Sequence, residues 1–336
     1  MSINRRKVAR AAPALALLTL AAAALNTRPA RADESGISFW LPGLFGSLAA
    51  VPTQPGFNFA TFNYYTSVNS ATNVKFQIGA RLVAGVEAHV DFQYLNLNYV
   101  FATPVFGGQA AIGINSLFGN NATSVFGTLT GPNGGALSGG RQQSSTGFGD
   151  LYPLATIKWN QGVNNFMVYA AGDIPVGLYS ADNIANLGIG HGAIDSGLGY
   201  TYFNPQTGNE LSAVTGFTYN MINQSTNYQN GVDWHLDWAA SHFLTPNVMF
   251  GVVGYFYDQL TGDSGSGAKL GPFESRVVGV GPQLGVLFPV AGMQGYLNAK
   301  GYAEFDAHAR PSGHNLWLTL SISPAVPRPP SIVATN

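Results

Sequence analysis

The sequence predicts an all-β protein: a transmembrane up-and-down antiparallel β-barrel of 12 strands, with short periplasmic turns and longer extracellular loops. Charged residues make up only 9% of the chain although 46% is hydrophobic, whereas an ordinary soluble domain is about 25% charged. After the N-terminus no apolar run approaches the roughly 18 residues that suggest a membrane-spanning helix. Segments with apolar residues at every second position recur instead, and a closed barrel of such strands leaves no backbone group unpaired in lipid.

Residues 1–32 have the features of a cleaved secretory signal peptide, namely a basic start, a short apolar stretch and the small-residue sequence "ARA" at its end. Cleavage there removes 6 of the 15 basic residues and none of the 16 acidic ones, which leaves a net charge of −7. Nucleic acid is therefore not expected as a partner. The chain has no cysteine, so an exported protein must be held together by its fold alone.

Residues 33–56 precede the first strand and are either a periplasmic lead-in or a plug inside the barrel; the sequence favours neither. Residues 57–323 are expected to form the barrel, and 324–336 a Pro-rich tail. The expected strands lie near 57–68, 84–101, 108–118, 148–160, 164–178, 192–204, 210–223, 232–244, 247–260, 275–288, 295–307 and 313–323. Short connections such as "TPN" alternate with longer ones such as "TGDSGSGAKLGPFE", as in bacterial barrels with both chain ends in the periplasm.

Alternation within the strands assigns the faces. In strand 232–244 the sequence "DWHLDW" places acidic residues and histidine on one face and large apolar residues on the other. Because charge facing lipid is costly, the polar face should line the lumen. The residues expected there are Glu87, His89, Asp91, Asp150, Lys158, Asp173, Glu210, Asp233, His235, Asp237, Lys300, Glu304 and Asp306. The polar face of 84–101 switches after Tyr94, which predicts a bulge, and 247–260 is apolar on both faces, which predicts contact with a plug or an apolar solute.

Several stretches resemble, in the same order, the outer-membrane family of meta-pathway phenol-degradation proteins, often called transporters. They are "GFGDLYPLATIKW" (147–159), "GDIPVGLYS" (172–180), "NLGIGHGA" (186–193), "TNYQNGVDWHLDW" (226–238), "GVVGYFYDQLTGDSG" (251–265) and "VVGVGPQLGVLF" (277–288). The resemblance implies an outer-membrane barrel of a Gram-negative bacterium, associated with breakdown of aromatic compounds, and no reaction of its own. One departure is the last strand, "LWLTLSIS", which lacks the terminal aromatic residue common in such barrels.

The expected function is therefore passive uptake of small hydrophobic or aromatic solutes by an outer-membrane channel that is not an enzyme. Outer-membrane lipids, lipopolysaccharide and the barrel-assembly machinery are the other expected partners. Two alternatives stay open. One is an enzyme that modifies lipid or lipopolysaccharide, with Ser264 of "GDSG" as nucleophile, although Gly, Asp and Ser are ordinary loop formers. The other is a closed structural or adhesion barrel.

No cofactor or metal site is expected. The nearest candidate is Asp233-x-His235-x-Asp237, whose side chains share one face of a strand. Successive side chains on one face lie about 7 Å apart, too far for one ion without help from a neighbouring strand. A polar wall of the lumen is the preferred interpretation.

Overall fold

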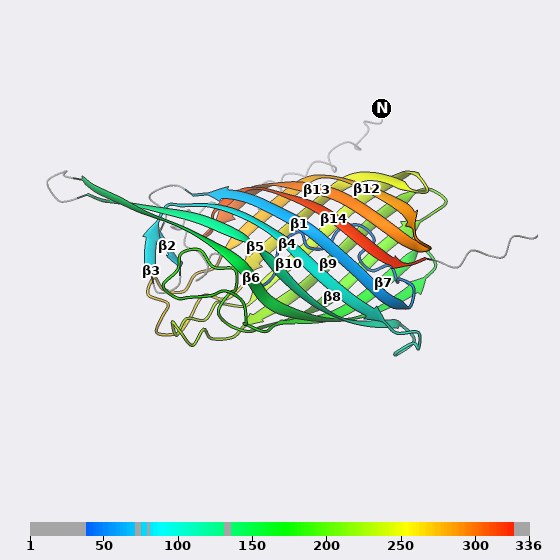
Figure 1. Cartoon of the computed structure of the whole chain (residues 1–336), viewed down its shortest axis with the longest axis horizontal. Coiled ribbons are helices and arrows are strands. Elements are labelled where there is room, and N and C mark those ends of the chain that lie inside the picture. The colour runs from blue at the N-terminus through cyan, green and yellow to red at the C-terminus, as the bar shows by residue number, and fades with distance from the viewer. Residues whose placement is uncertain (1–37, 71–74, 79–80, 131–135, 326–336) are drawn as a thin grey trace, which may run out of the picture.

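Twelve strands, in which apolar and polar residues alternate, pair side by side into a closed barrel whose last strand pairs with the first (Figure 1). The structure is a computed structural model that describes residues 38–70, 75–78, 81–130 and 136–325. The barrel strands are β1 (Gly56–Asn69), β4 (Val86–Val100), β5 (Gln109–Thr130), β6 (Ala136–Gln161), β7 (Asn164–Asp173), β8 (Ala193–Asn204), β9 (Asn209–Asn220), β10 (Asp233–Thr245), β11 (Val248–Gln259), β12 (Arg276–Val290), β13 (Met293–His308) and β14 (Ser312–Pro324). The proposed signal peptide, residues 1–32, and most of the predicted tail lie outside the described residues.

The order of the strands is the up-and-down order predicted from the sequence. Every barrel strand pairs antiparallel with its neighbours in the chain, and β1 closes the barrel by pairing with β14. A barrel closed in this way has no free edge at which another chain could pair. The prediction of a 12-stranded antiparallel barrel is confirmed, and each predicted strand corresponds to an observed one.

The sequence did not predict the short hairpin β2 (Lys75–Ile78) and β3 (Arg81–Ala84), which forms a separate two-stranded sheet within the connection from β1 to β4. Strands of four residues carry too little alternation to be recognised. Strands β5 and β6 are also much longer than expected, and together they project beyond the other strands at the left of Figure 1. The long connections gather at this end, here called the loop end, and the short ones at the opposite end, the turn end.

The outside of the barrel carries a belt of apolar side chains. Exposed apolar residues alternate with inward ones, as shown by Leu95 and Leu97 on β4, Ile112 and Ile114 on β5, and Leu316 on β14. None of the described residues forms a helix long and apolar enough to cross a membrane.

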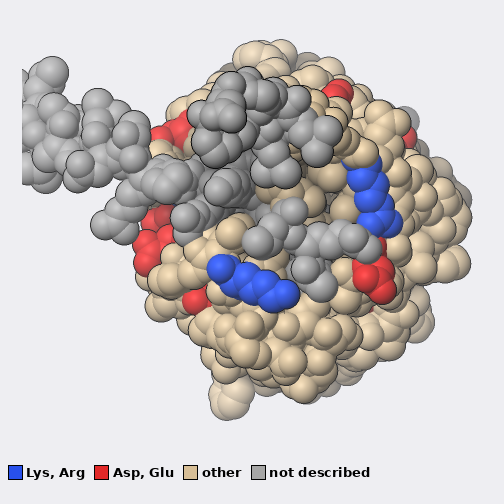
Figure 2. Space-filling model, turned by 90° about the vertical axis from the view of Figure 1, so that its left-hand side faces the viewer, with Lys and Arg blue, Asp and Glu red and all other residues tan. Residues whose placement is uncertain are grey.

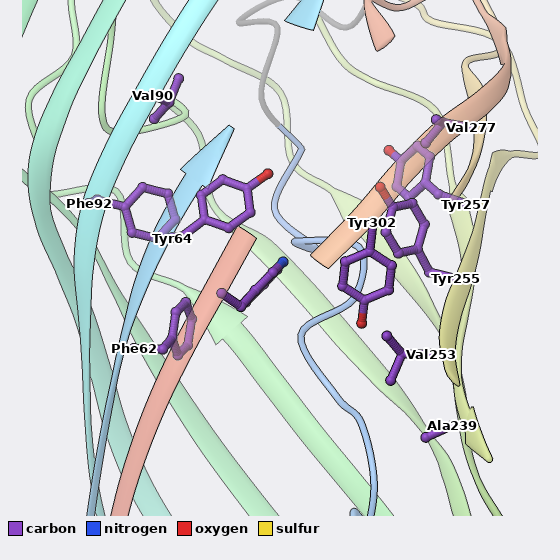
Figure 3. Close-up of a cluster of buried hydrophobic side chains, with 11 residues drawn as sticks. Phe62, Tyr64, Val90, Phe92, Ala239, Val253, Tyr255, Tyr257, Val277 and Tyr302 are labelled. Carbon is purple, nitrogen blue, oxygen red and sulfur yellow. The ribbon is translucent and has the colours of Figure 1, made fainter. Parts of the chain in front are cut away.

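The inside of the barrel is filled in part by residues 38–55, here called the plug, which run from the loop end toward β1. Trp40 and Ala50 of the plug are fully buried and belong to one apolar cluster with Met167, Tyr169 and Val214. A second cluster surrounds the plug residues Leu41 and Leu44. In Figure 3 the blue plug chain passes between Phe62, Tyr64 and Phe92 on one side and Tyr255, Tyr257 and Tyr302 on the other.

Candidate functional site

The plug is mostly apolar and forms no regular secondary structure, so its backbone needs hydrogen-bond partners on the barrel wall. Two carboxylates accept from its N–H groups. Asp237 on β10 accepts from the N–H groups of Gly43 (2.8 Å) and Phe45 (3.0 Å). Glu210 on β9 accepts from the N–H of Leu48 (3.0 Å) and from the Ser47 hydroxyl (2.7 Å). Each hydrogen bond to a charged group contributes about 1.5–3 kcal/mol, so these carboxylates fix the path of the plug.

Lysine side chains bind the plug carbonyls in the complementary way. The ammonium of Lys300 on β13 donates to the carbonyl of Gly43 and, at 3.2 Å, to that of Leu44. The same ammonium lies 4.6 Å from the centre of the Trp317 ring, within the range of a cation–π contact. Lys158 on β6 makes a single longer bond, 3.3 Å, to the carbonyl of Val51.

Gly43 of the plug lies close against the barrel wall. Its φ is +87°, a region that side chains with a Cβ rarely adopt. A Cβ at this position would lie 3.0 Å from the Tyr302 ring and 3.1 Å from the Tyr255 ring. Tyr255 lies on β11, and the inner face of this strand packs around the plug, which explains why the strand is apolar on both faces.

The start of the plug is held by a buried stack of an indole ring on an imidazole ring. The Trp40 and His235 rings are stacked with centroids 3.6 Å apart and planes inclined by 13°. His235 is fully buried, and its Nε2 lies 2.9 Å from the Asp195 carboxylate. Within the described residues no group of three or more His, Cys, Asp or Glu side chains is arranged to hold a metal ion. Asp237 binds the plug and Asp233 accepts from the Asn220 amide, so the three residues of the Asp-x-His-x-Asp stretch have different partners.

Most side chains expected in the lumen are buried or partly buried on the inner side of the wall: Asp150, Lys158, Asp173, Glu210, Asp233, His235, Asp237, Lys300 and Glu304. Some of them position protein segments other than the plug. Asp150 accepts from the N–H groups of Gly177 (2.7 Å) and Ile189 (2.8 Å) and so holds the 174–192 connection against the barrel. Glu304 accepts from the Tyr255 hydroxyl at 2.7 Å.

The expectation that Glu87, His89 and Asp91 line the lumen is wrong. Their side chains are exposed, whereas Val90 and Phe92 between and beside them are buried. The predicted bulge is also absent, because β4 keeps a continuous register with both β1 and β5. The inner face is simply apolar here, and the outward charges have polar cross-strand neighbours at the loop end, where water can solvate them.

Asp306 is likewise displaced from the lumen. A register shift between β12 and β13 lies next to it, and its φ is +51°. The side chain is 47% exposed and pairs with Arg276 at 3.2 Å and with His308 at 3.1 Å. Strict alternation along β13 fails at this irregularity, and this failure explains the error.

An apolar cavity of about 370 Å³ lies beside the plug. Its walls come from β1, β4, β5, β6, β7 and β14, together with the plug itself. Toward the loop end the lining is apolar and includes Phe62, Phe92 and Leu117, and toward the turn end it becomes polar, with Asn98 and Lys158. The volume falls within the range of about 300–1,000 Å³ typical of small-molecule sites.

A second cavity, of about 120 Å³, continues toward the loop end and is lined by residues such as Tyr64, Ile78 and Ile184. Ser38, Leu41, Val90 and Phe92 line both cavities. These shared residues lie between the two cavities, which follow one side of the plug. Figure 2 views the loop end, where uncharged residues make up most of the described surface and basic and acidic side chains lie scattered among them.

Sequence reasoning missed the residues of the apolar wall, notably Phe62, Phe92 and Tyr94. The rule that the interior is polar assigns such residues to lipid. A usable signal was present, because Asn96 and Asn98 share the parity of Phe92 and Tyr94. An unbroken parity would have placed all four inside.

The "GDSG" stretch forms part of a clasp between two connections at the loop end. Asp263 is buried, accepts from the Tyr228 hydroxyl, and accepts from the Gln259 amide at 2.7 Å and the Gly231 N–H at 3.2 Å. Ser264 is exposed, and its backbone pairs with that of Gln229. Among the described histidines, the ring hydrogen bonds go to other partners than Ser264.

Comparison with solved structures finds the same fold. The chain is similar to an outer membrane channel from Pseudomonas putida F1, with a TM-score of 0.62 and 13% identity over 81% of this chain and 96% of that one. A Pseudomonas aeruginosa FadL homologue (TM-score 0.40, 9% identity, 80% and 90% covered) and the transport unit of the autotransporter AIDA-I from Escherichia coli (0.38, 10%, 81% and 91%) match less well. Scores as low as these two do not establish a common fold.

No curated protein matches this sequence. The family model described as "Putative MetA-pathway of phenol degradation" matches residues 71–320, which is 250 of the 336 residues and spans almost the whole barrel. This chain therefore belongs to that phenol-degradation family.

Proposed function

We propose that the protein is an outer-membrane channel through which small hydrophobic or aromatic solutes diffuse passively, along the path between the plug and the apolar wall. The observation that carries this proposal is that two cavities lie in line beside the plug and share Leu41, Val90 and Phe92 in their walls. An apolar solute entering at the loop end would exchange water for the aromatic wall, which is favourable by about 25 cal/mol per Å² of apolar surface buried.

The proposed location is the outer membrane of a Gram-negative bacterium. The belt of exposed apolar side chains supports contact with lipid, and a closed barrel satisfies every backbone group there. On this proposal residues 1–32 are removed on export, the barrel-assembly machinery inserts residues 57–323, and lipids and lipopolysaccharide surround the barrel.

The link to aromatic compounds rests on the family and on the chemistry of the wall. The family description names phenol degradation, and the wall offers stacked rings, such as Phe62 and Tyr94 with centroids 4.5 Å apart. We propose uptake rather than catalysis. Ser264 is exposed, and among the described residues the histidine hydrogen bonds go to other partners, as His235 does to Asp195. The alternative of an enzyme with Ser264 as nucleophile therefore gains no support.

Uptake of radiolabelled naphthalene tests the proposal, measured in Gram-negative cells that lack their own general porins. Cells that express the protein should take up naphthalene faster than cells with an empty vector, because lipopolysaccharide slows entry through lipid. The variant Leu41→Trp, which places a larger side chain between the two cavities, should return uptake to the vector level, whereas Leu97→Trp on the outer face should not. Vector-level uptake by the correctly inserted wild-type protein would refute the channel.

A further inference from the structure

The larger cavity is almost free of charge. Its lining combines aromatic and aliphatic side chains with neutral Asn, Gln, Ser and Thr side chains, and among the described residues that line it Lys158 alone carries a charge. An ammonium beside an apolar space loses hydration, which is costly unless an anion or several acceptors replace the water. The cavity therefore has one position at which a negative group would be favoured.

Lys158 has spare hydrogen-bonding capacity. A lysine ammonium has three donors, and the structure gives this one a single acceptor, the Val51 carbonyl at 3.3 Å. The ion pairs recorded for the described residues do not include it. Lys300, the other lysine that contacts the plug, binds the carbonyls of Gly43 and Leu44 and stays outside the cavity lining. Of these two lysines, Lys158 is therefore the one whose ammonium has N–H donors left for a ligand.

Because Lys158 lies near one end of the cavity, one end of the cavity is positively charged and the other is apolar. Lys158 lies opposite Gln109 in the β5–β6 register, near the turn end, and both residues line the cavity. The rings of Phe62 and Phe92 lie at the other end of the same cavity, toward the loops. A molecule with an apolar body and one anionic end would match both ends at once.

We propose that this cavity binds aromatic organic anions, with the negative group at the Lys158 ammonium and the aromatic body against Phe62 and Phe92. The inference rests on the proposed channel and narrows its substrate class from small hydrophobic or aromatic solutes to amphipathic aromatic carboxylates. A solute that travels from the loop end would move with its charged end toward the periplasm.

Calorimetric titration of the purified full-length processed protein tests the proposal with two matched probes, 4-phenylbutyrate and its neutral amide. The wild-type protein should bind the carboxylate about 10-fold or more tightly than the amide, the effect of one hydrogen bond to a charged group. Lys158→Met should weaken carboxylate binding by about the same factor and leave the amide unchanged. Lys158→Arg should restore the preference.

A second variant keeps the lysine and its bond to the plug. Gln109→Glu places a carboxylate opposite Lys158, which should neutralise it and abolish the preference for the anion, whereas Gln109→Leu should preserve the preference. Equal binding of both probes by the wild-type protein would overturn the proposal while leaving the channel intact, because the neutral aromatic amide would still bind. Failure of the channel is seen separately, as vector-level naphthalene uptake.

Discussion

The two halves of the barrel interior differ in what they hold. Strands β8 to β13 bind the plug through ions and amides, with Asp237, Glu210 and Lys300 in direct contact with its backbone. Strands β14, β1 and β4 to β7 form the wall of the apolar cavity beside the plug, and they contact the plug through apolar packing and the hydrogen bond from Lys158. The acidic and basic residues of the interior thus act mainly as structural ligands of an internal chain segment, and the space left for a solute is bounded largely by aromatic and aliphatic groups.

The difference shows that the polarity of the inner wall matches what the wall contacts, which is the plug backbone on one side and the cavity on the other. Where a bare backbone must be bound, charged side chains supply its hydrogen bonds, and Gln283 adds an amide that donates to the Ser47 hydroxyl at 2.7 Å. Along the apolar wall a charge would have no partner and would cost free energy, and among the described residues that line the cavity only Lys158, near the turn end, is charged.

The largest effect is expected from Asp237→Ala. The change leaves the N–H groups of Gly43 and Phe45 without their acceptor, and two hydrogen bonds to a charged group contribute about 3–6 kcal/mol. The plug should leave the wall, so that single-channel conductance rises and chymotrypsin cleaves near Trp40. Asp306→Ala, which removes an exposed carboxylate, is the control. Equal resistance of both variants to chymotrypsin would show that Asp237 does not hold the plug.

Lysine substitutions compare the halves directly. Lys300→Met deprives the Gly43 and Leu44 carbonyls of their donor and should lower the free energy of unfolding by about 3 kcal/mol, whereas Lys158→Met, which loses one long bond, should lower it by about 1 kcal/mol. Denaturant unfolding monitored by tryptophan fluorescence measures both. If the two losses are the same, the plug is bound equally by the two halves and the comparison fails.

Leu41→Ala should widen the space between the two cavities. The lost side chain should cost about 2 kcal/mol, at the low end for Leu→Ala in a core, because Leu41 is only partly buried. Naphthalene uptake should rise above the wild-type rate. Leu97→Ala on the outer face is the matched control and should leave uptake unchanged, and a slower rate for Leu41→Ala would mean that solutes take another path.

The pH dependence of His191 should report on the 174–192 connection. Leu187 and Ile184 of this connection line the larger and the smaller cavity, respectively. Burial lowers the pKa of His191, so the imidazole stays neutral in the folded protein while an unfolded chain takes up a proton below about pH 6.5. Stability should therefore fall as the pH drops from about 6.5 toward the lowered pKa. The hydrogen-exchange protection of residues 184–191, taken relative to the intrinsic exchange rate at each pH, should fall over this range in the wild-type protein and much less in His191→Gln.

The smallest effect is expected from Ser264→Ala, within about 0.5 kcal/mol of the wild-type stability, as for other exposed positions. Naphthalene uptake should not change. Asp263→Ala is the contrast, because it removes the acceptor shared by Tyr228, Gln259 and Gly231 and should expose the 260–275 connection to proteolysis. Loss of uptake in Ser264→Ala alone would point to chemistry at this loop and away from the interior.

The barrel could be predicted from the sequence because its signals are local. Alternation identifies each strand, and the lengths of the connections identify its direction, so the predicted 232–244 became the observed Asp233–Thr245 with Asp233, His235 and Asp237 on the buried face. The same reasoning failed for Glu87, His89 and Asp91. Alternation separates two faces of a strand, but it does not say which face is inside when the inner face is apolar.

The remaining features depend on tertiary contacts. Local sequence patterns are enough to specify a closed barrel of 12 strands, since period-two patterning and turn residues act over a few positions. Whether residues 38–55 enter the barrel depends on contacts such as Gly43 with Asp237, 194 residues apart in the chain. Likewise, the cavity depends on where the plug lies inside the barrel, with its hydrogen bonds mainly to β9, β10 and β13 and space left beside the wall of β1, β4 and β5. Local sequence patterns do not predict such long-range contacts, because the contacts of the plug depend on an inner surface that forms only when the barrel closes.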